Sequence, residues 1–266
     1  MSNTTSQAVQ YDDQTGFDNV DALASRVISE LARRHSNDRT YPIDVFVQKL
    51  CHVAQLGDAA ATDRLFEDIN ASGITPEEIV DCYIPQSARF LGDQWLNDRL
   101  GFADVTIGCA RLQKMLRTVP EQYDSKKYPT VRHFNALMIV PQDDDHTLGA
   151  MVATDQLRRM GGSVHLSLGQ SHSEILAASE CGNFDVIMIS ASRNDRLELI
   201  LKLTDILRDS SVHLPPIVLG GTIINNARNL NSLTGVDHVT NDLHEALRLC
   251  GLKIQNQNVV FGVTWS

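Results

Sequence analysis

One short stretch of the sequence places a histidine among carboxylates in an order that could bind a metal. It runs from Gln142 to Gly149 and reads QDDDHTLG. The carboxylate of Asp144, two residues before His146, can hold one ring nitrogen while the other faces outward as a ligand. The same residues could instead form a solvated acidic loop in which an aspartate caps the next helix. Taken alone, the stretch leaves both interpretations open.

The residues around this stretch predict a sheet that would position it. After residue 134, helical segments alternate with short apolar runs, which predict strands at 135–141, 164–168, 184–189, 216–219 and 236–239. Such alternation predicts a parallel sheet covered by helices on both faces. Ligands of these sheets bind beyond the carboxyl ends of the strands, where the strand order reverses. The loop that contains His146 follows the first strand, so we expect it at the ligand-binding edge.

The N-terminal half shows helical periodicity and no strand pattern. Apolar residues recur at helical spacing from Val20 to Leu31, which predicts an amphipathic helix that either packs on the main body or docks a partner. Residues 42–119 predict four or five further helices that form a bundle. Within this bundle, Pro85 should kink or interrupt a helix that begins near Pro76.

These patterns divide the chain into consecutive parts. The tail at 1–17 lacks apolar periodicity and is expected to be disordered. The other parts are a helical cap domain at 18–119, a linker at 120–133, an α/β domain at 134–251 and a C-terminal tail at 252–266.

Composition bounds the partners that the protein can have. The 266 residues carry a formal net charge of −10, so tight DNA binding by the chain alone is not expected. A protein partner fits this charge better. The N-terminus lacks the basic and apolar regions of a signal peptide, and no apolar run reaches membrane-spanning length. We therefore expect a cytoplasmic protein that makes no membrane contact.

Two further motifs follow the histidine, and the three together resemble the cobalamin-binding domain of methionine synthase, methylmalonyl-CoA mutase and their relatives. That family carries DxHxxG, then SxL, then GG. The matching positions are Asp144, His146, Gly149, Ser190, Ser192, Gly220 and Gly221. The resemblance covers residues 132–251 and implies a doubly wound, flavodoxin-like domain that binds cobalamin.

The resemblance implies a role for each motif residue. His146 would replace the dimethylbenzimidazole base as the lower ligand of cobalt, and Asp144 would orient its imidazole. Ser190 would hydrogen-bond the displaced base. Because a residue without Cβ lets a ligand approach the backbone, three glycines would leave room for the nucleotide tail: Gly149, Gly220 and Gly221.

Two positions depart from the family pattern. Ser192 stands where leucine is usual, which would alter the packing along the slot for the base. Arg196 stands where methionine synthase has a hydroxyl that continues the hydrogen-bond relay behind the histidine. We therefore expect the relay to stop at Asp144.

The helical half carries a resemblance of its own. The stretch IPQSARFLGDQW, which contains Pro85, Gly92 and Trp95, resembles the helical cap over the upper face of cobalamin in methionine synthase and cobalamin photoreceptors. Trp95 could lie over the corrin, or it could be an aromatic residue of the bundle core. Light-sensing regulators of the CarH type carry Glu-His where Val105 and Thr106 stand here. Hydroxo- or aquocobalamin is therefore favoured as the cofactor, with methyl- and adenosylcobalamin as alternatives.

The order of the parts resembles the AerR/PpaA family of purple bacteria, whose members are cobalamin-binding antirepressors of PpsR/CrtJ-type repressors of photosynthesis genes. This resemblance implies a transcriptional regulator that responds to light or redox state and is not an enzyme. A corrinoid methyl-carrier protein of a methyltransferase system is the alternative, because such a carrier needs no further catalytic residues. A radical mutase is excluded, since its substrate barrel needs a far longer chain than 266 residues.

Overall fold

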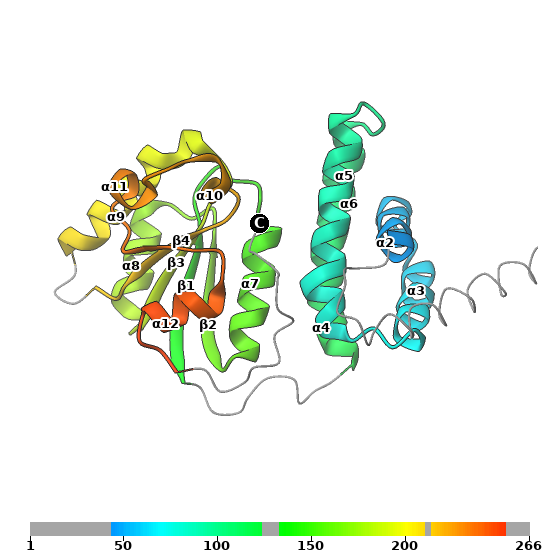
Figure 1. Cartoon of the computed structure of the whole chain (residues 1–266), viewed down its shortest axis with the longest axis horizontal. Coiled ribbons are helices and arrows are strands. Elements are labelled where there is room, and N and C mark those ends of the chain that lie inside the picture. Colours follow the sequence, from blue (N-terminus) through cyan, green and yellow to red (C-terminus); the bar gives the residue numbers. More distant parts are fainter. Residues whose placement is uncertain (1–43, 124–132, 211–213, 254–266) are drawn as a thin grey trace, which may run out of the picture.

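The computed structural model describes residues 44–123, 133–210 and 214–253, which form a helical half and an α/β half (Figure 1). The predicted tail at 1–17, the predicted helix from Val20 to Leu31 and the C-terminal residues from 254 on lie outside these ranges. Within the described ranges, no helix is both long enough and apolar enough to cross a membrane.

The helical half confirms the predicted bundle. Its elements are α2 (Asp44–Leu56), α3 (Ala59–Ala71), α4 (Pro76–Glu78), the π-helical turn η1 (Ile79–Tyr83), α5 (Ile84–Leu96) and α6 (Phe102–Tyr123). The long helices α5 and α6 run side by side in Figure 1 and contact each other and α2. Their apolar faces form one core, in which Phe46, Ile69 and Leu112 are almost completely buried.

The start of α4 and the break before Pro85 follow from local chemistry. The Thr75 hydroxyl accepts from the Glu78 backbone N–H, and the Glu78 carboxylate accepts from the Thr75 N–H, which closes a capping box. Pro85 has no N–H to donate, and its ring would collide with the carbonyl of the residue four positions earlier. The chain widens into η1 instead, where the Ile84 N–H donates to the Ile79 carbonyl. The predicted interruption is therefore a π-helical turn.

Helix α6 passes the predicted boundary of the linker. We expected the linker to begin at residue 120, but the helix continues through Pro120 to Tyr123. Val119, the residue before the proline, is completely buried. Packing at Val119 therefore holds the backbone helical where a proline by itself disfavours this conformation.

The α/β half is a parallel sheet whose strands lie in the order β2-β1-β3-β4-β5. The strands are β1 (Phe134–Val140), β2 (Gly162–Leu168), β3 (Val186–Ser190), β4 (Ile217–Gly220) and β5 (His238–Val239). The helical elements between and after them are α7 (Leu148–Arg159), α8 (His172–Cys181), η2 (Asn194–Arg196), α9 (Leu197–Ser210), α10 (Ile223–Asn226), α11 (Leu230–Thr234) and α12 (Leu243–Leu249). This order confirms the predicted doubly wound, flavodoxin-like fold.

Both faces of the sheet are covered, which explains the continuous apolar runs of its strands. On one face, Met138 of β1 packs with α7 and α12. On the other face, Leu137 and Ile139 pack with α8 and α9 (Figure 1). Polar side chains for a site must therefore come from the loops at the strand ends.

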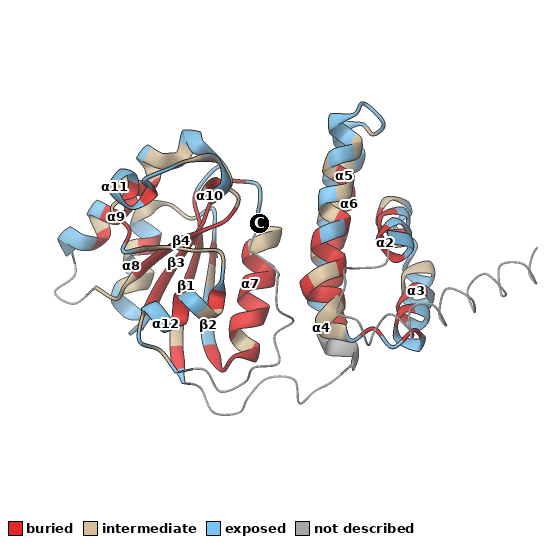
Figure 2. Cartoon of the chain, in the orientation of Figure 1, coloured by how far each residue is buried: buried red, intermediate tan, exposed pale blue. Residues whose placement is uncertain are grey.

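Helix α7 belongs to the packing of both halves. Ala153 and Leu157 pack on the sheet, whereas Met151 and Val152 join the core of the helical half. Figure 2 shows α7 buried over most of its length, in contrast to the exposed tips of α5 and α6. The two halves therefore meet along α7.

A buried ion pair crosses this contact near the C-terminal end of α7. The Arg159 guanidinium binds the carboxylate of Asp81 in η1 and, at 2.8 Å, the carboxylate of Asp155 one turn earlier. All three side chains are at most 7 % exposed. Burial opposes the charge on Arg159, but the attraction of Asp81 and Asp155 outweighs it and raises the pKa of Arg159. Arg159 therefore stays a cation that links the two halves.

Candidate functional site

The loop between β1 and α7 lies at the switch point of the sheet. β1 pairs with β2 on one side and with β3 on the other, so the strand order reverses at its carboxyl end. The loop turns at Asp143, whose φ of 63° lies in the left-handed region that aspartate tolerates. Arg196, which follows β3, donates to the Asp143 carbonyl at 3.2 Å. The structure thus places His146 at the predicted edge of the sheet.

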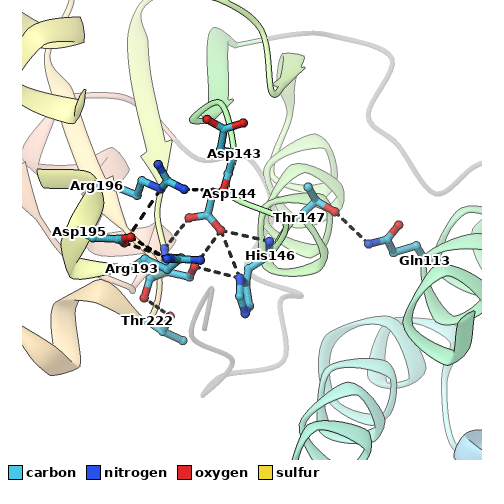
Figure 3. Close-up of polar contacts among 10 residues, drawn as sticks. Gln113, Asp143, Asp144, His146, Thr147, Arg193, Asp195, Arg196 and Thr222 are labelled. Atoms are coloured by element: carbon cyan, nitrogen blue, oxygen red, sulfur yellow. Dashed lines mark hydrogen bonds and ion pairs between the residues drawn. The ribbon is translucent and has the colours of Figure 1, made fainter. Parts of the chain in front are cut away.

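Asp144 is the centre of a hydrogen-bond network that holds His146 (Figure 3). Its Oδ1 accepts from the His146 backbone N–H at 3.1 Å and lies 3.2 Å from the imidazole Nδ1. Its Oδ2 accepts from the Ser192 backbone N–H at 2.8 Å. The Asp144 side chain is completely buried, whereas the His146 side chain is 68 % exposed. A buried carboxylate therefore holds an exposed imidazole by one nitrogen.

These contacts favour an anionic Asp144 beside the ring. Burial by itself raises the pKa of Asp144, but the hydrogen bonds from His146 and Ser192 together outweigh burial and hold this pKa well below its ordinary value. The hydrogen bond to Asp144 raises the pKa of His146 despite the partial burial of the ring.

The acceptor on Asp144 decides which nitrogen of His146 can be a ligand. Because an anionic carboxylate only accepts hydrogen bonds, its contact with Nδ1 favours the tautomer that carries the hydrogen on Nδ1. The lone pair of the neutral ring is then on Nε2. In Figure 3 the ring extends away from Asp144, and this second nitrogen lies clear of the drawn contacts. The imidazole therefore presents Nε2 at the sheet edge.

Ser192 makes contacts that the sequence did not predict, while its packing beside a bound base stays a prediction. We expected it to line the slot for the base in place of leucine, and we expected the relay to stop at Asp144. Instead, the Ser192 hydroxyl donates to Asp144 Oδ1 at 2.7 Å and lies 3.0 Å from His146 Nδ1. Arg196, at the position of the methionine synthase hydroxyl, donates to a backbone carbonyl. The relay therefore includes a hydroxyl, which comes from a different position in the loop after β3.

The other motif residues lie at neighbouring strand ends. Ser190 is buried at the end of β3 and pairs with Gly220 at the end of β4. Gly221 follows with a φ of 99°, and a Cβ there would lie 2.2 Å from the Ala191 carbonyl oxygen. The chain's own backbone therefore requires glycine at position 221. Gly149 lies in the first turn of α7. The roles of these residues toward a displaced base and a nucleotide tail stay predictions.

The helical half faces this edge through one stripe of α6. The Gln113 side-chain amide donates to the Thr147 hydroxyl at 2.9 Å, directly beside His146 in the chain. Thr106 and Phe102 precede Gln113 by seven and eleven residues, spacings that return to the same helix face. They lie about 10 and 16 Å farther along the helix axis, and both are exposed. The exposed stripe of α6 therefore continues beyond its contact with the His146 loop.

The three residues predicted to face the upper side of cobalamin have different surroundings in the structure. Trp95 is 45 % exposed and contacts Phe102 edge-on, with 6.2 Å between ring centroids, so it is not a bundle-core residue. Thr106 is exposed, and its hydroxyl donates to the Phe102 carbonyl. Val105 packs against the core of the helical half instead.

Sequence reasoning missed two residues of the exposed stripe of α6. Phe102 stands four residues before Thr106, and Gln113 stands seven residues after it. Residues at these spacings share a helix face. The helical pattern around Thr106 could therefore have found both.

The fold defines a class of protein. The monomethylamine corrinoid protein of Methanosarcina barkeri superposes on this chain with a TM-score of 0.60, over 76 % of this chain and 94 % of its own. The two sequences are 17 % identical. This protein therefore shares the fold of that corrinoid protein. No protein-family model matches the sequence.

A sequence relative then identifies the family. In Rhodobacter capsulatus, an "uncharacterized 20.5 kDa protein in bchF-crtJ intergenic region" is 34 % identical over 181 residues. The match covers 68 % of this chain and 94 % of the relative. This chain belongs to the same family as the Rhodobacter protein.

Proposed function

We propose that this protein binds cobalamin through His146 and acts as a transcriptional antirepressor, without catalysing a reaction. The observation that carries the proposal is the orientation of the imidazole. Asp144 and Ser192 hold Nδ1, and Nε2 lies clear of this network at the switch point of the sheet. A single imidazole in this position would supply one nitrogen ligand to the cobalt of a bound corrinoid.

The surrounding residues fit a corrinoid. Ser190 offers a buried hydroxyl at the end of β3, beside the glycines that end β4. Together with Gly149, these residues would flank the displaced base and the nucleotide tail. The fold shared with the Methanosarcina corrinoid protein supports this assignment.

Hydroxo- or aquocobalamin is the form that we propose for the bound cofactor. Bound cobalamin would supply a cobalt centre that can respond to light or to redox state. On the stripe of α6 that faces the His146 loop, Thr106 offers neither the carboxylate nor the imidazole that would hold a larger upper ligand. Gln113 links this stripe to Thr147, so a shift of α6 reaches the His146 loop through a direct hydrogen bond.

A PpsR/CrtJ-type repressor in the cytoplasm is the partner that we propose. The net charge of −10 favours action through a DNA-bound protein over direct DNA binding. The gene of the Rhodobacter relative lies between bchF and crtJ, which supports a link to this regulator. Cobalamin can change repressor binding only if two states of this protein, one that binds the repressor and one that does not, differ in their affinity for cobalamin.

Titration of the repressor with this protein tests the proposal. The repressor is titrated with apoprotein and with hydroxocobalamin-loaded protein, in darkness and after illumination, and His146→Ala serves as the matched variant. We expect repressor affinity to differ between apo and loaded wild type, and to be independent of added cobalamin in the variant. Equal affinity in all states of the wild type would contradict the regulatory role.

A corrinoid methyl carrier is the second candidate function. The fold shared with a monomethylamine corrinoid protein is the observation that favours it. Transfer of a methyl group to the loaded protein by a methyltransferase, together with unchanged repressor affinity, would support the carrier over the regulator.

A further inference from the structure

The loop after β3 brings a hydroxyl to the inner nitrogen of His146. The Ser192 Oγ lies 2.7 Å from Asp144 Oδ1 and 3.0 Å from His146 Nδ1. The Asp144 Oδ1 itself lies 3.2 Å from the same Nδ1, at the long end of the N–H···O range. Ser192 is therefore the nearer of the two acceptors that Nδ1 can use.

The position of Ser192 is determined by contacts on both sides of its side chain. Its backbone N–H donates to Asp144 Oδ2 at 2.8 Å, and its carbonyl accepts from the Thr222 hydroxyl at 3.3 Å. Arg196 in the same loop donates to the Asp143 carbonyl of the facing loop. These bonds hold the loop in place without the Ser192 hydroxyl, so the hydroxyl is available for the ring.

The hydrogen count of Ser192 determines the direction of each bond. A serine hydroxyl has one hydrogen, and an anionic Asp144 can only accept, so that hydrogen goes to Asp144. The Ser192 oxygen can then only accept from Nδ1–H. If the ring carried its hydrogen on Nε2, Nδ1 could only accept, and the Ser192 hydroxyl would have to donate to Nδ1 instead of Asp144. The network therefore favours the tautomer with hydrogen on Nδ1.

We propose that Ser192 is a positioning residue that holds His146 in the Nδ1–H tautomer and so leaves Nε2 as the ligand nitrogen. This proposal rests on the proposed ligand role of His146 and adds a determinant of that role. The hydroxyl acts through the imidazole and does not touch the metal itself.

The test compares two variants of Ser192 that have nearly the same shape, one with and one without a hydroxyl, and a third variant that has neither the hydroxyl nor added bulk. Ser192→Thr keeps the hydroxyl, Ser192→Val replaces it with a methyl group, and Ser192→Ala adds no bulk. Nitrogen-15 NMR of histidine-labelled apoprotein, at a pH where the ring is neutral, reports the tautomer of His146, and His146→Ala assigns its signals. We expect the Nδ1–H form to dominate in wild type and Ser192→Thr, and a larger share of the Nε2–H form in Ser192→Val and Ser192→Ala, where only Asp144 still favours Nδ1–H. If His146 has the same tautomer in Ser192→Val and Ser192→Ala as in wild type, the proposal is overturned.

Titration with hydroxocobalamin completes the test. We expect Ser192→Val and Ser192→Ala to bind hydroxocobalamin about 10-fold more weakly than wild type, the lower end of the loss that follows removal of a partner of a ligating histidine. Ser192→Thr should bind like wild type. Weaker binding by Ser192→Val or Ser192→Ala with an unchanged tautomer of His146 would overturn the proposal. A tautomer and an affinity of Ser192→Thr that equal those of Ser192→Val would overturn it as well. If wild type does not bind hydroxocobalamin, the proposed function fails, while the NMR comparison still decides the role of Ser192.

Discussion

The two ends of α7 meet the helical half in opposite ways. At the C-terminal end, which we call the buried end, Arg159 is 5 % exposed and is bound by Asp81 from η1. At the N-terminal end, which we call the exposed end, Gln113 bonds to Thr147, and the residue directly before Thr147 in the chain, His146, has a side chain that is 68 % exposed. The buried end fixes how the two halves sit together. The exposed end can therefore keep the His146 imidazole accessible without loss of the domain contact.

The tip formed by α5 and α6, in the helical half, also leaves large apolar side chains in contact with water. Leu96, the last residue of α5, is 73 % exposed, and Phe102, the first residue of α6, is 71 % exposed. Figure 2 shows the tip formed by these two helices as exposed. Complete burial of one such side chain would contribute about 1.5–3 kcal/mol. A cluster of exposed apolar residues of this kind is typical of a surface that binds a ligand or a partner. The contrast therefore separates a buried contact that joins the two halves from an apolar surface that stays accessible.

The largest expected effect comes from breaking the buried end. Arg159→Met leaves the carboxylates of Asp81 and Asp155 buried without their cation, which should destabilise the fold by about 3–5 kcal/mol. The measurement is the midpoint of urea denaturation. Arg193→Met is the matched control, because Arg193 pairs with Asp195 on the surface, and it should leave the midpoint unchanged. Equal midpoints for the two variants would show that the buried pair does not hold the halves together.

A smaller effect is expected at the exposed end. Gln113→Ala removes the amide that donates to Thr147, and loss of one such half-buried hydrogen bond should cost about 1 kcal/mol. Calorimetric unfolding and hydroxocobalamin titration measure the change in stability and any weakening of binding. The neighbouring exposed Lys114→Ala is the control. A loss as large as that of Arg159→Met would contradict the distinction between the two ends.

The smallest effect concerns the choice of cobalamin. Since Thr106 presents no carboxylate or imidazole on the outward stripe of α6, hydroxocobalamin should bind at least as tightly as adenosylcobalamin in the dark. Parallel titrations followed by absorption spectroscopy measure both affinities. Strong dark selectivity for adenosylcobalamin would mean that other residues of the exposed end form a pocket for the adenosyl group.

The fold could be predicted from the sequence because its signals are local. The apolar run of β1 is only seven residues long, whereas the helical spacing in α7 extends over twelve residues. Length and flanking turn residues separate strand from helix in such cases. The proline at position 85 predicted an interruption, but its form as a π-helical turn depends on how the backbone avoids one carbonyl. The local sequence pattern therefore predicts the interruption but not its π-helical form.

The candidate site could be predicted in part. His146 and Asp144 are two residues apart, so their contact follows from the loop itself. Ser192 lies 48 residues from Asp144, and its direction depends on how the loops after β1 and β3 face each other. Asp81 and Arg159 are 78 residues apart, and no periodic pattern joins them. Such contacts become visible only when the packing of the two halves is known.

The coordination of cobalt by His146 is the central claim, and electron paramagnetic resonance tests it most directly. The protein is labelled with nitrogen-15 in histidine alone, loaded with unlabelled cobalamin and reduced to the cobalt(II) form. A histidine ligand then splits the cobalt lines into doublets, because nitrogen-15 has nuclear spin one-half, whereas the unlabelled dimethylbenzimidazole base splits them into triplets. We predict doublets for the wild type and their loss in His146→Ala. Triplets in the labelled wild type, or doublets that persist in His146→Ala, would contradict the assignment of His146 as the lower ligand.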